Sequence, residues 1–163
     1  MERKFTKRNT QQGTTTVEFA FIGFLLFLIL FGVIEVARLV FVMNSLVEVT
    51  RRAARVAVVC PVEHIDIRKI GALNSPGGSD NSRYLKNLST ANFNLDYLNE
   101  FGATTSSFSD IDYVRFSISN YQHQMLIPGL NVTINSKSFS TTIPVESLGY
   151  IPETNTRECF GTA

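Results

Sequence analysis

Residues 19–34 read FAFIGFLLFLILFGVI, sixteen consecutive residues without a charged side chain or a hydroxyl group. Apolar residues continue on both sides, so that residues 17–37 form a stretch of 21 residues with Glu18 and Glu35 near its two ends. An α-helix rises about 1.5 Å per residue and needs about 20 mostly apolar residues to cross the hydrocarbon core of a bilayer. We therefore expect residues 17–37 to span a membrane once.

Two other kinds of segment share this composition. A helix that is apolar on all sides can be the buried core of a large protein, but this chain has too little other protein to cover it. A cleavable secretory signal has an apolar stretch of about 7–15 residues, followed by small residues at its cut site. The present stretch is longer and no such site follows it. A membrane anchor that is not removed as a secretory signal fits better.

The helix is expected to continue beyond the membrane. No proline occurs before Pro61, and Gly23 and Gly32 are the only glycines between residues 14 and 59. The sequence therefore predicts one unbroken helix over residues 14–59, about 70 Å long. Pro61 ends this helix, because the residue before a proline avoids the helical region of backbone conformation.

The outer half of the predicted helix is amphipathic. At 100° per residue its charged side chains gather on one face, and the rest of its surface is mostly Val and Ala. A lipid-headgroup patch, a nucleic-acid patch and a solvated helix face are alternative interpretations, of which the solvated face is the simplest. The net charge of +1 for the whole chain argues against a dedicated nucleic-acid binder. The charged residues are Glu48, Arg51, Arg52 and Arg55.

A short basic segment precedes the apolar helix. Residues 1–13 contain four basic side chains and one acidic side chain, and they end in Gly13. Glu18 follows five residues later, at the mouth of the apolar stretch. This spacing resembles the cleavage region of type IV prepilins. The resemblance implies that a membrane aspartyl peptidase cuts between Gly13 and Thr14, so that residues 1–13 are a leader and Glu18 is the fifth residue of the mature chain.

The residue types around this bond suit such a cut. Glycine lets the backbone enter a narrow cleft without a clash at Cβ. The three threonines at positions 14–16 are poor helix formers, which leaves the backbone beside the bond open to extension.

A longer set of motifs resembles the TadE-like proteins, minor pseudopilins of the tight-adherence (Flp) pilus system. GTTTVEFA at residues 13–20, FGVIEVAR at 31–38 and RAAR at 52–55 follow one another in the family's order. The resemblance covers roughly residues 13–58 and implies a structural subunit of TadE or TadF type, not an enzyme. Major pilins of this class are far shorter and usually carry Glu-Tyr, whereas this chain has Glu18-Phe19, which favours a minor subunit.

The resemblance also implies roles and surroundings. It implies that Glu18 and Phe19 act in assembly and set the axial register of the packed helices. The glutamate then pairs with the freed amino group of its own or a neighbouring subunit. Basic residues flank both ends of the span almost equally, so charge alone leaves the orientation open. In the family the leader is cytoplasmic and residues after about 38 lie in the periplasm. We expect a single-pass protein of the bacterial inner membrane, with a further place in the pilus as an option.

The expected partners are the inner membrane, a prepilin peptidase, other pilin and pseudopilin subunits and the pilus assembly platform. Neither a cofactor nor a nucleic acid is expected. The alternative is an uncleaved single-pass membrane protein whose extracytoplasmic domain binds a ligand or a surface.

Residues 60–163 are expected to form a small extracytoplasmic domain. The predicted fold class is α+β: a long N-terminal transmembrane helix continues into a pilin-like domain, whose short three-stranded antiparallel sheet packs on the outer half of the helix. The predicted elements are a short helix within 62–73, a loop at 74–82, short helices or turns at 83–88 and 95–101, a strand over 111–119, and a hairpin of 131–135 with 139–145.

Few side chains of this chain suggest chemistry. Glu35 and Arg38 stand three residues apart and are expected to pair with each other or to reach the membrane surface. Cys60 and Cys159 bracket the outer domain, and a periplasmic location permits a disulfide between them. Cys60 and His64 are four residues apart, but a proline lies between them and no zinc-site spacing occurs. We predict neither catalytic residues nor metal ligands.

Overall fold

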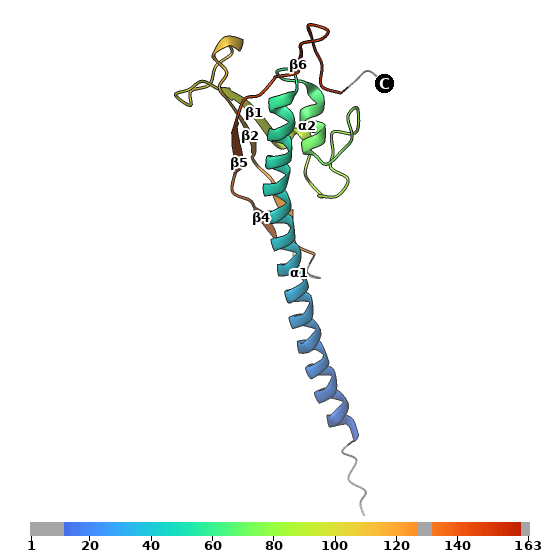
Figure 1. Cartoon of the computed structure of the whole chain (residues 1–163). Coiled ribbons are helices and arrows are strands. Elements are labelled where there is room, and N and C mark those ends of the chain that lie inside the picture. Colours follow the sequence, from blue (N-terminus) through green and yellow to red (C-terminus); the bar gives the residue numbers. More distant parts are fainter. Residues whose placement is uncertain (1–11, 127–131, 161–163) are drawn as a thin grey trace, which may run out of the picture.

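The computed structural model describes residues 12–126 and 132–160 (Figure 1). A single helix, α1 (Gln12–Val59), runs through the whole molecule and is 48 residues long. One half of α1 stands alone as a stem, and a small α+β domain packs against the other half (Figure 1). The structure thus confirms the predicted α+β fold with a long apolar N-terminal helix.

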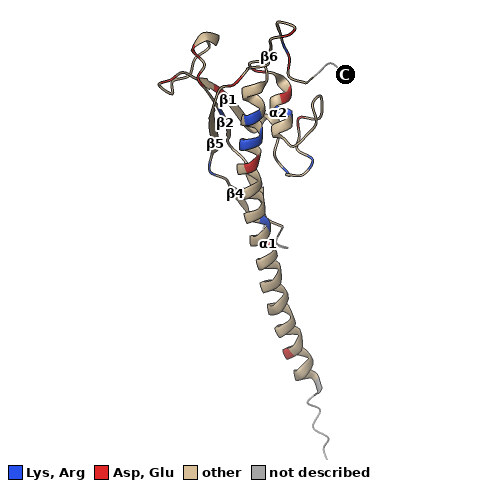
Figure 2. Cartoon of the chain, viewed as in Figure 1, with Lys and Arg blue, Asp and Glu red and all other residues tan. Residues whose placement is uncertain are grey.

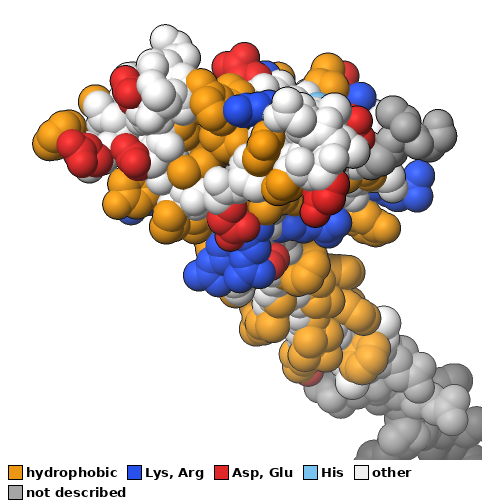
Figure 3. All heavy atoms as spheres, turned by 45° about the horizontal axis from the view of Figure 1, so that its top comes forward, with side chains coloured by type: hydrophobic (Ala, Val, Ile, Leu, Met, Phe, Trp, Pro, Cys, Tyr) orange, Lys and Arg blue, Asp and Glu red, His pale blue; other side chains and the backbone are white. Residues whose placement is uncertain are grey.

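The stem, residues 13–34, is covered by no other described element. All its residues are exposed apart from Gly23 and Gly32, which are half-buried, and its surface is apolar (Figure 3). Its 22 residues measure about 33 Å at the helical rise, close to the thickness of a bilayer core. By length and composition α1 can cross a membrane. The outer domain begins to cover α1 at Glu35, two residues before the predicted end of the span.

The core of the outer domain forms between α1 and a three-stranded antiparallel sheet. Its strands β1 (Phe93–Leu98), β2 (Tyr113–Ile118) and β5 (Phe139–Pro144) lie in the order β1-β2-β5. Along β2 the side chains of Val114, Phe116 and Ile118 alternate toward α1 and are buried. They pack against the apolar face of α1, formed by Leu46, Val49, Ala53 and Ala57.

A second helix, α2 (Ile65–Gly71), lies beside the end of α1. A side chain at Gly71 would place its Cβ 3.1 Å from Phe116 Cζ and 3.2 Å from Ala53 Cβ. The small residues at positions 53 and 71 therefore let the two helices approach closely over the sheet.

Short elements complete the domain. The strands β3 (Gln122–Gln124) and β4 (Thr133–Asn135) pair with each other, as do β6 (Tyr150–Ile151) and β7 (Thr156–Arg157). Two 3-10 turns precede strands of the main sheet: η1 (Thr90–Asn92) leads into β1, and η2 (Phe108–Asp110) comes before β2.

The C-terminal segment returns to the end of α1. Cys159 is joined to Cys60 by a disulfide, with 4.6 Å between their Cα atoms. Gly149 has φ +78°, and a Cβ there would lie 2.6 Å from Pro61 Cδ. Only glycine combines this backbone conformation with such a close approach. The end of α1 and residues 148–159 thus form one packed unit.

The predicted helix within 62–73 and the predicted strand within 111–119 are confirmed as α2 and β2. Residues 83–88 form bends and a turn, as one of the two predicted options had it. Two other predictions are wrong. Residues 95–98 are not a helix or turn but belong to β1, because Phe93, Leu95 and Tyr97 alternate into the core, and only residues 100–101 form a turn.

The predicted hairpin of residues 131–135 with 139–145 does not form between its two described arms. β4 pairs with β3, where Ile134 lies opposite His123, and β5 pairs with β2, where Phe139 lies opposite Ile118. The two arms separate because each pairs with a different partner: β5 forms an edge strand of the main sheet, where it also contacts α1, and β4 pairs with β3.

The core predicts a large effect of truncating Phe116. Its side chain is fully buried and packs on Phe93, with 5.2 Å between ring centroids. We expect Phe116→Ala to lower the free energy of unfolding by about 3–5 kcal/mol, because it removes apolar burial and leaves a cavity. The measurement is urea unfolding of the full chain in mild detergent, followed by the fluorescence of the buried Tyr97 and Tyr121.

A matched control is Phe101→Ala, since Phe101 is 85% exposed. This variant should stay within about 0.5 kcal/mol of the parent protein. Equal effects of the two substitutions would contradict the assignment of Phe116 to the core.

Candidate functional site

The expected processing region lies at the free end of the stem. Gly13 and Thr14 stand in the first turn of α1, and a Cβ added at Gly13 would meet no atom within 4 Å. The rest of the expected leader, residues 1–11, lies outside the described residues. Thr14 is exposed and helical here, so a peptidase would have to open the first turn. Threonine's low helix propensity and the position at a helix end make that opening easy.

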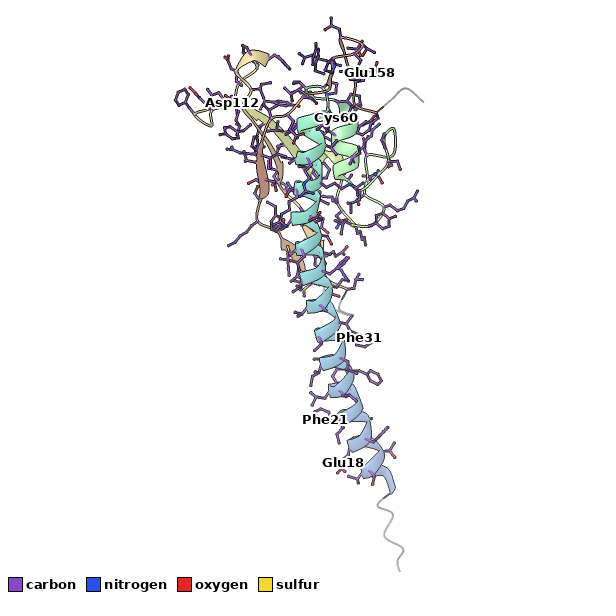
Figure 4. The ribbon with its side chains drawn as sticks, viewed as in Figure 1. Glu18, Phe21, Phe31, Cys60, Asp112 and Glu158 are labelled. Atoms are coloured by element: carbon purple, nitrogen blue, oxygen red, sulfur yellow. A yellow bond between two sulfur atoms is a disulfide. The ribbon has the colours of Figure 1, made fainter. Side chains whose placement is uncertain are left out.

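Glu18 and Phe19 lie one turn further along the stem. Both are exposed, and Glu18 is seen near the free end of α1 in Figure 4. Thr14 and Glu18 are four residues apart, so they share one face of the helix. Glu18 is the only ionisable residue between positions 14 and 34, and among the described residues it forms no ion pair. A carboxylate at this depth is stabilised by a cationic partner or by the membrane surface.

Where the stem meets the outer domain, three side chains form a polar group that we name the junction cluster: Glu35, Arg38 and His123. Glu35 is 5% exposed, and its Oε2 accepts a hydrogen bond from Arg38 Nη1 at 3.0 Å. Its Oε1 lies 3.7 Å from His123 Nε2 and accepts the backbone N–H of Leu126 at 3.1 Å. The buried carboxylate is therefore both paired and hydrogen-bonded, which offsets the cost of removing it from water.

Arg38 ties α1 to the strand region. Its Nη2 donates to the carbonyl oxygen of Gln124 and lies 3.5 Å from His123 Nε2. A neutral imidazole can accept at this nitrogen. The sequence predicted that Glu35 and Arg38 would pair or reach the membrane surface. In the structure they pair, and the chain segment from residue 123 to 126 covers the pair.

The environment of His123 favours its neutral form. Burial lowers the pKa of the His123 imidazole below its ordinary value of 6.5, and the positive charge of Arg38 lowers it further. Glu35 opposes both effects but does not outweigh them. Sequence reasoning did not find this residue, because 88 positions separate it from Glu35. A local signal that could have indicated its burial is the alternation in β3, where His123 points inward between two exposed glutamines.

Three arginines follow on α1 at the level of the outer domain, at positions marked in blue in Figure 2. Arg51, Arg52 and Arg55 are exposed, and among the described residues they form no ion pair. Arg51 lies 17 residues beyond Ile34, or about 25 Å along the helix axis, whereas a headgroup layer is only about 5–8 Å thick. This distance favours the solvated helix face over a lipid-headgroup patch.

Cysteine and histidine serve the fold at the far end of α1. Cys60 is bonded to Cys159, and the His64 side chain accepts the backbone N–H of Asp66 at 3.3 Å at the start of α2. Within residues 12–126 and 132–160, no group of three or more His, Cys, Asp or Glu side chains is placed to hold a metal ion. The features that call for a functional explanation are therefore the apolar stem, its two ends and the junction cluster.

The model of the TadE-like protein family matches residues 13–55. This range contains the stem, the Glu35–Arg38 pair and the arginines, and it ends within α1, before α2 and the strands of the outer domain. The resemblance drawn from the motifs is thus confirmed for this part of α1. No curated protein and no solved structure matches the chain. TadE-like proteins are structural, pilus-associated membrane proteins, and residues 13–55 of this chain are similar to them.

The junction cluster predicts a pH dependence of stability. The unfolded chain takes up a proton at His123 near pH 6.5, while the folded chain resists it because its pKa is lowered. Stability is therefore full above about pH 6.5 and falls as the pH drops toward the folded-state pKa. We expect the thermal midpoint of the full chain in detergent to be lower at pH 5.5 than at pH 7.5.

His123→Asn should reduce this difference in midpoint, whatever its effect on stability at pH 7.5. His64→Asn is the matched control, because His64 is the other imidazole of the chain and asparagine preserves a helix cap. The same pH dependence in His123→Asn as in the control would contradict the assignment.

Proposed function

We propose that the protein is a minor pseudopilin of a tight-adherence pilus. A prepilin peptidase cuts the chain between Gly13 and Thr14. The stem then moves out of the lipid bilayer and packs with other pilin helices. The outer domain contacts neighbouring assembly subunits. The observation that carries this proposal is the exposed apolar stem, which begins at a glycine, has Glu18 five residues after that glycine and matches the TadE-like family model.

The exposure of the stem supports a role in assembly. Its large side chains are bare on every side, with Phe19 77% exposed. Lipid tails keep such an apolar surface away from water. Packing against similar helices can replace the lipid and keeps the same surface buried. A stem that only anchors a domain has no need of a charged residue inside it, whereas an assembling stem can use one to select its register.

Glu18 is suited to that role. Cleavage at Thr14 would create an amino group one helical turn from Glu18 and on the same face. In a low-dielectric setting the carboxylate is stabilised by such a cation, either of its own chain or of a neighbouring subunit. Helices that slide out of register would leave both charges unpaired, so the pair selects one axial arrangement.

The opposite end of α1 supports an extracytoplasmic location. A bond between Cys60 and Cys159 persists in an oxidising compartment such as the periplasm. We place residues 1–13 in the cytoplasm, the stem in the inner membrane and the outer domain in the periplasm.

The rival function is an uncleaved single-pass protein whose outer domain binds a ligand or a surface. It predicts that the basic leader stays attached and that Glu18 is a boundary residue without a partner. Processing and assembly therefore distinguish the two functions.

We expect Gly13→Ala to block processing, because a methyl group at this position obstructs the narrow cleft that a peptidase of this class uses. The measurement is the ratio of full-length to mature protein in native membranes by immunoblot. Gly23→Ala is the matched control, since a Cβ at either glycine meets no atom within 4 Å. Normal processing of Gly13→Ala would remove the peptidase from the proposal.

We expect Glu18→Gln to be cut normally but to be incorporated into pili or pilus complexes at least about tenfold less, because one unpaired charge in lipid costs more than 1.4 kcal/mol. The measurement is the amount of the subunit in sheared pili relative to membranes. Glu48→Gln, at an exposed position of α1 within the outer domain, controls for loss of a carboxylate. Equal incorporation of both variants would reduce Glu18 to a boundary residue.

A further inference from the structure

A pocket of about 250 Å³ opens beside α1 just beyond the stem. One wall is α1 itself, through Arg38 and Phe41, and the other two walls come from residues 84–87 and 121–126. These three segments are far apart in sequence, and the fold brings them to the side of the outer domain that is nearest the stem. The pocket is therefore a feature of the tertiary structure and not of one loop.

Hydrogen bonds hold the walls of this pocket together. The buried hydroxyl of Tyr121 donates to the carbonyl oxygen of Lys86 at 3.0 Å. The Asn87 side-chain amide donates to the carbonyl oxygen of Gln122 at 3.2 Å. On the opposite wall, Glu35 fixes the Arg38 guanidinium. The Arg38 guanidinium and the backbone of the two facing segments are thus positioned before any ligand arrives.

The charges of the pocket sum to about one positive charge. Glu35 and Arg38 neutralise each other, and His123 is neutral because burial and Arg38 lower its pKa. Lys86 is exposed on the rim, and among the described residues it forms no ion pair. Three of the five N–H groups of Arg38 are directed at Glu35, Gln124 and the neutral His123, so the guanidinium keeps two donors for another acceptor.

The height of the pocket matches the headgroup layer of a membrane. Arg38 lies four residues beyond Ile34, the last residue of the stem, which is about 6 Å along the helix axis. Large amphipathic or apolar side chains surround the opening and are exposed: Phe41, Tyr84 and Leu126. Aromatic rings and long cationic side chains prefer this layer, where one end can be apolar and the other wet.

We propose that this pocket binds the headgroup of an anionic phospholipid from the leaflet next to the outer domain. Lys86 and the remaining N–H groups of Arg38 hold the phosphodiester. Leu126, whose backbone N–H bonds to Glu35 on the stem side of Arg38, lines the path of the first acyl methylenes. A phosphodiester with one negative charge complements the pocket's one positive charge. This inference rests on the membrane-spanning character of the stem and is independent of cleavage at Gly13.

The test is a lipid titration of the full chain in mild detergent, read by native mass spectrometry. The probes are phosphatidylglycerol, phosphatidylcholine with the same acyl chains, and inorganic phosphate. The parent protein should bind phosphatidylglycerol at least about tenfold more tightly than phosphatidylcholine, and Lys86→Glu should abolish this preference, because each cation near an anionic lipid contributes about 1 kcal/mol. Lys137→Glu is the control, since Lys137 is exposed and does not line the pocket.

Three results would overturn the proposal. One is equal affinity of the parent protein for the two lipids, and another is an unchanged preference in Lys86→Glu with its fold intact by circular dichroism. The third is displacement of phosphatidylglycerol by inorganic phosphate at equal concentration, which would make the pocket a site for free phosphate. Processing at Gly13 is unaffected by any of these results, so failure here is distinguishable from failure of the proposed function.

Discussion

One continuous helix has to be stable in two environments, lipid along the stem and water along the outer domain. The rest of the structure depends on this constraint. In residues 19–34 α1 is apolar all round, as lipid requires, and from Glu35 onward it is apolar on one face only. That face is not merely covered by the outer domain but forms part of its core, where Leu46, Val49 and Ala53 meet the sheet. The domain therefore cannot move relative to the stem without losing its own core, and a displacement of the stem carries the domain with it.

The junction cluster marks the change of solvent. Burying the charged carboxylate of Glu35 would cost free energy both in lipid and in an apolar protein core, yet Glu35 lies where these two environments meet. The domain resolves this by extending the segment from His123 to Leu126 along α1, so that Arg38, His123 and a backbone N–H surround the carboxylate. The outer domain consequently begins within about one helical turn of the membrane surface, which is also why a pocket beside Arg38 lies at headgroup height.

Sequence reasoning reached the features whose signal is local. The long helix follows from the apolar run and the position of Pro61, and β2 follows from the alternation of Val114, Phe116 and Ile118. β1 carried the same alternation in Phe93, Leu95 and Tyr97, but it was predicted as a short helix or turn. The wrong hairpin shows the limit of local signals, since the two arms are neighbours in sequence while β5 pairs with β2 and β4 pairs with β3. The contact of His123 with Glu35 and the neighbouring pocket bring together segments that are distant in the sequence. A single sequence contains no local pattern that predicts such contacts.

The central claim is that the apolar helix is a pilin-type stem that begins at Thr14. The most direct test is the intact mass of the protein purified from native membranes of cells with an active prepilin peptidase. We expect a chain that has lost residues 1–13 and begins at Thr14. A chain that still begins at Met1 in those cells would contradict it, and the protein would then be a single-pass anchor whose outer domain acts as a binder.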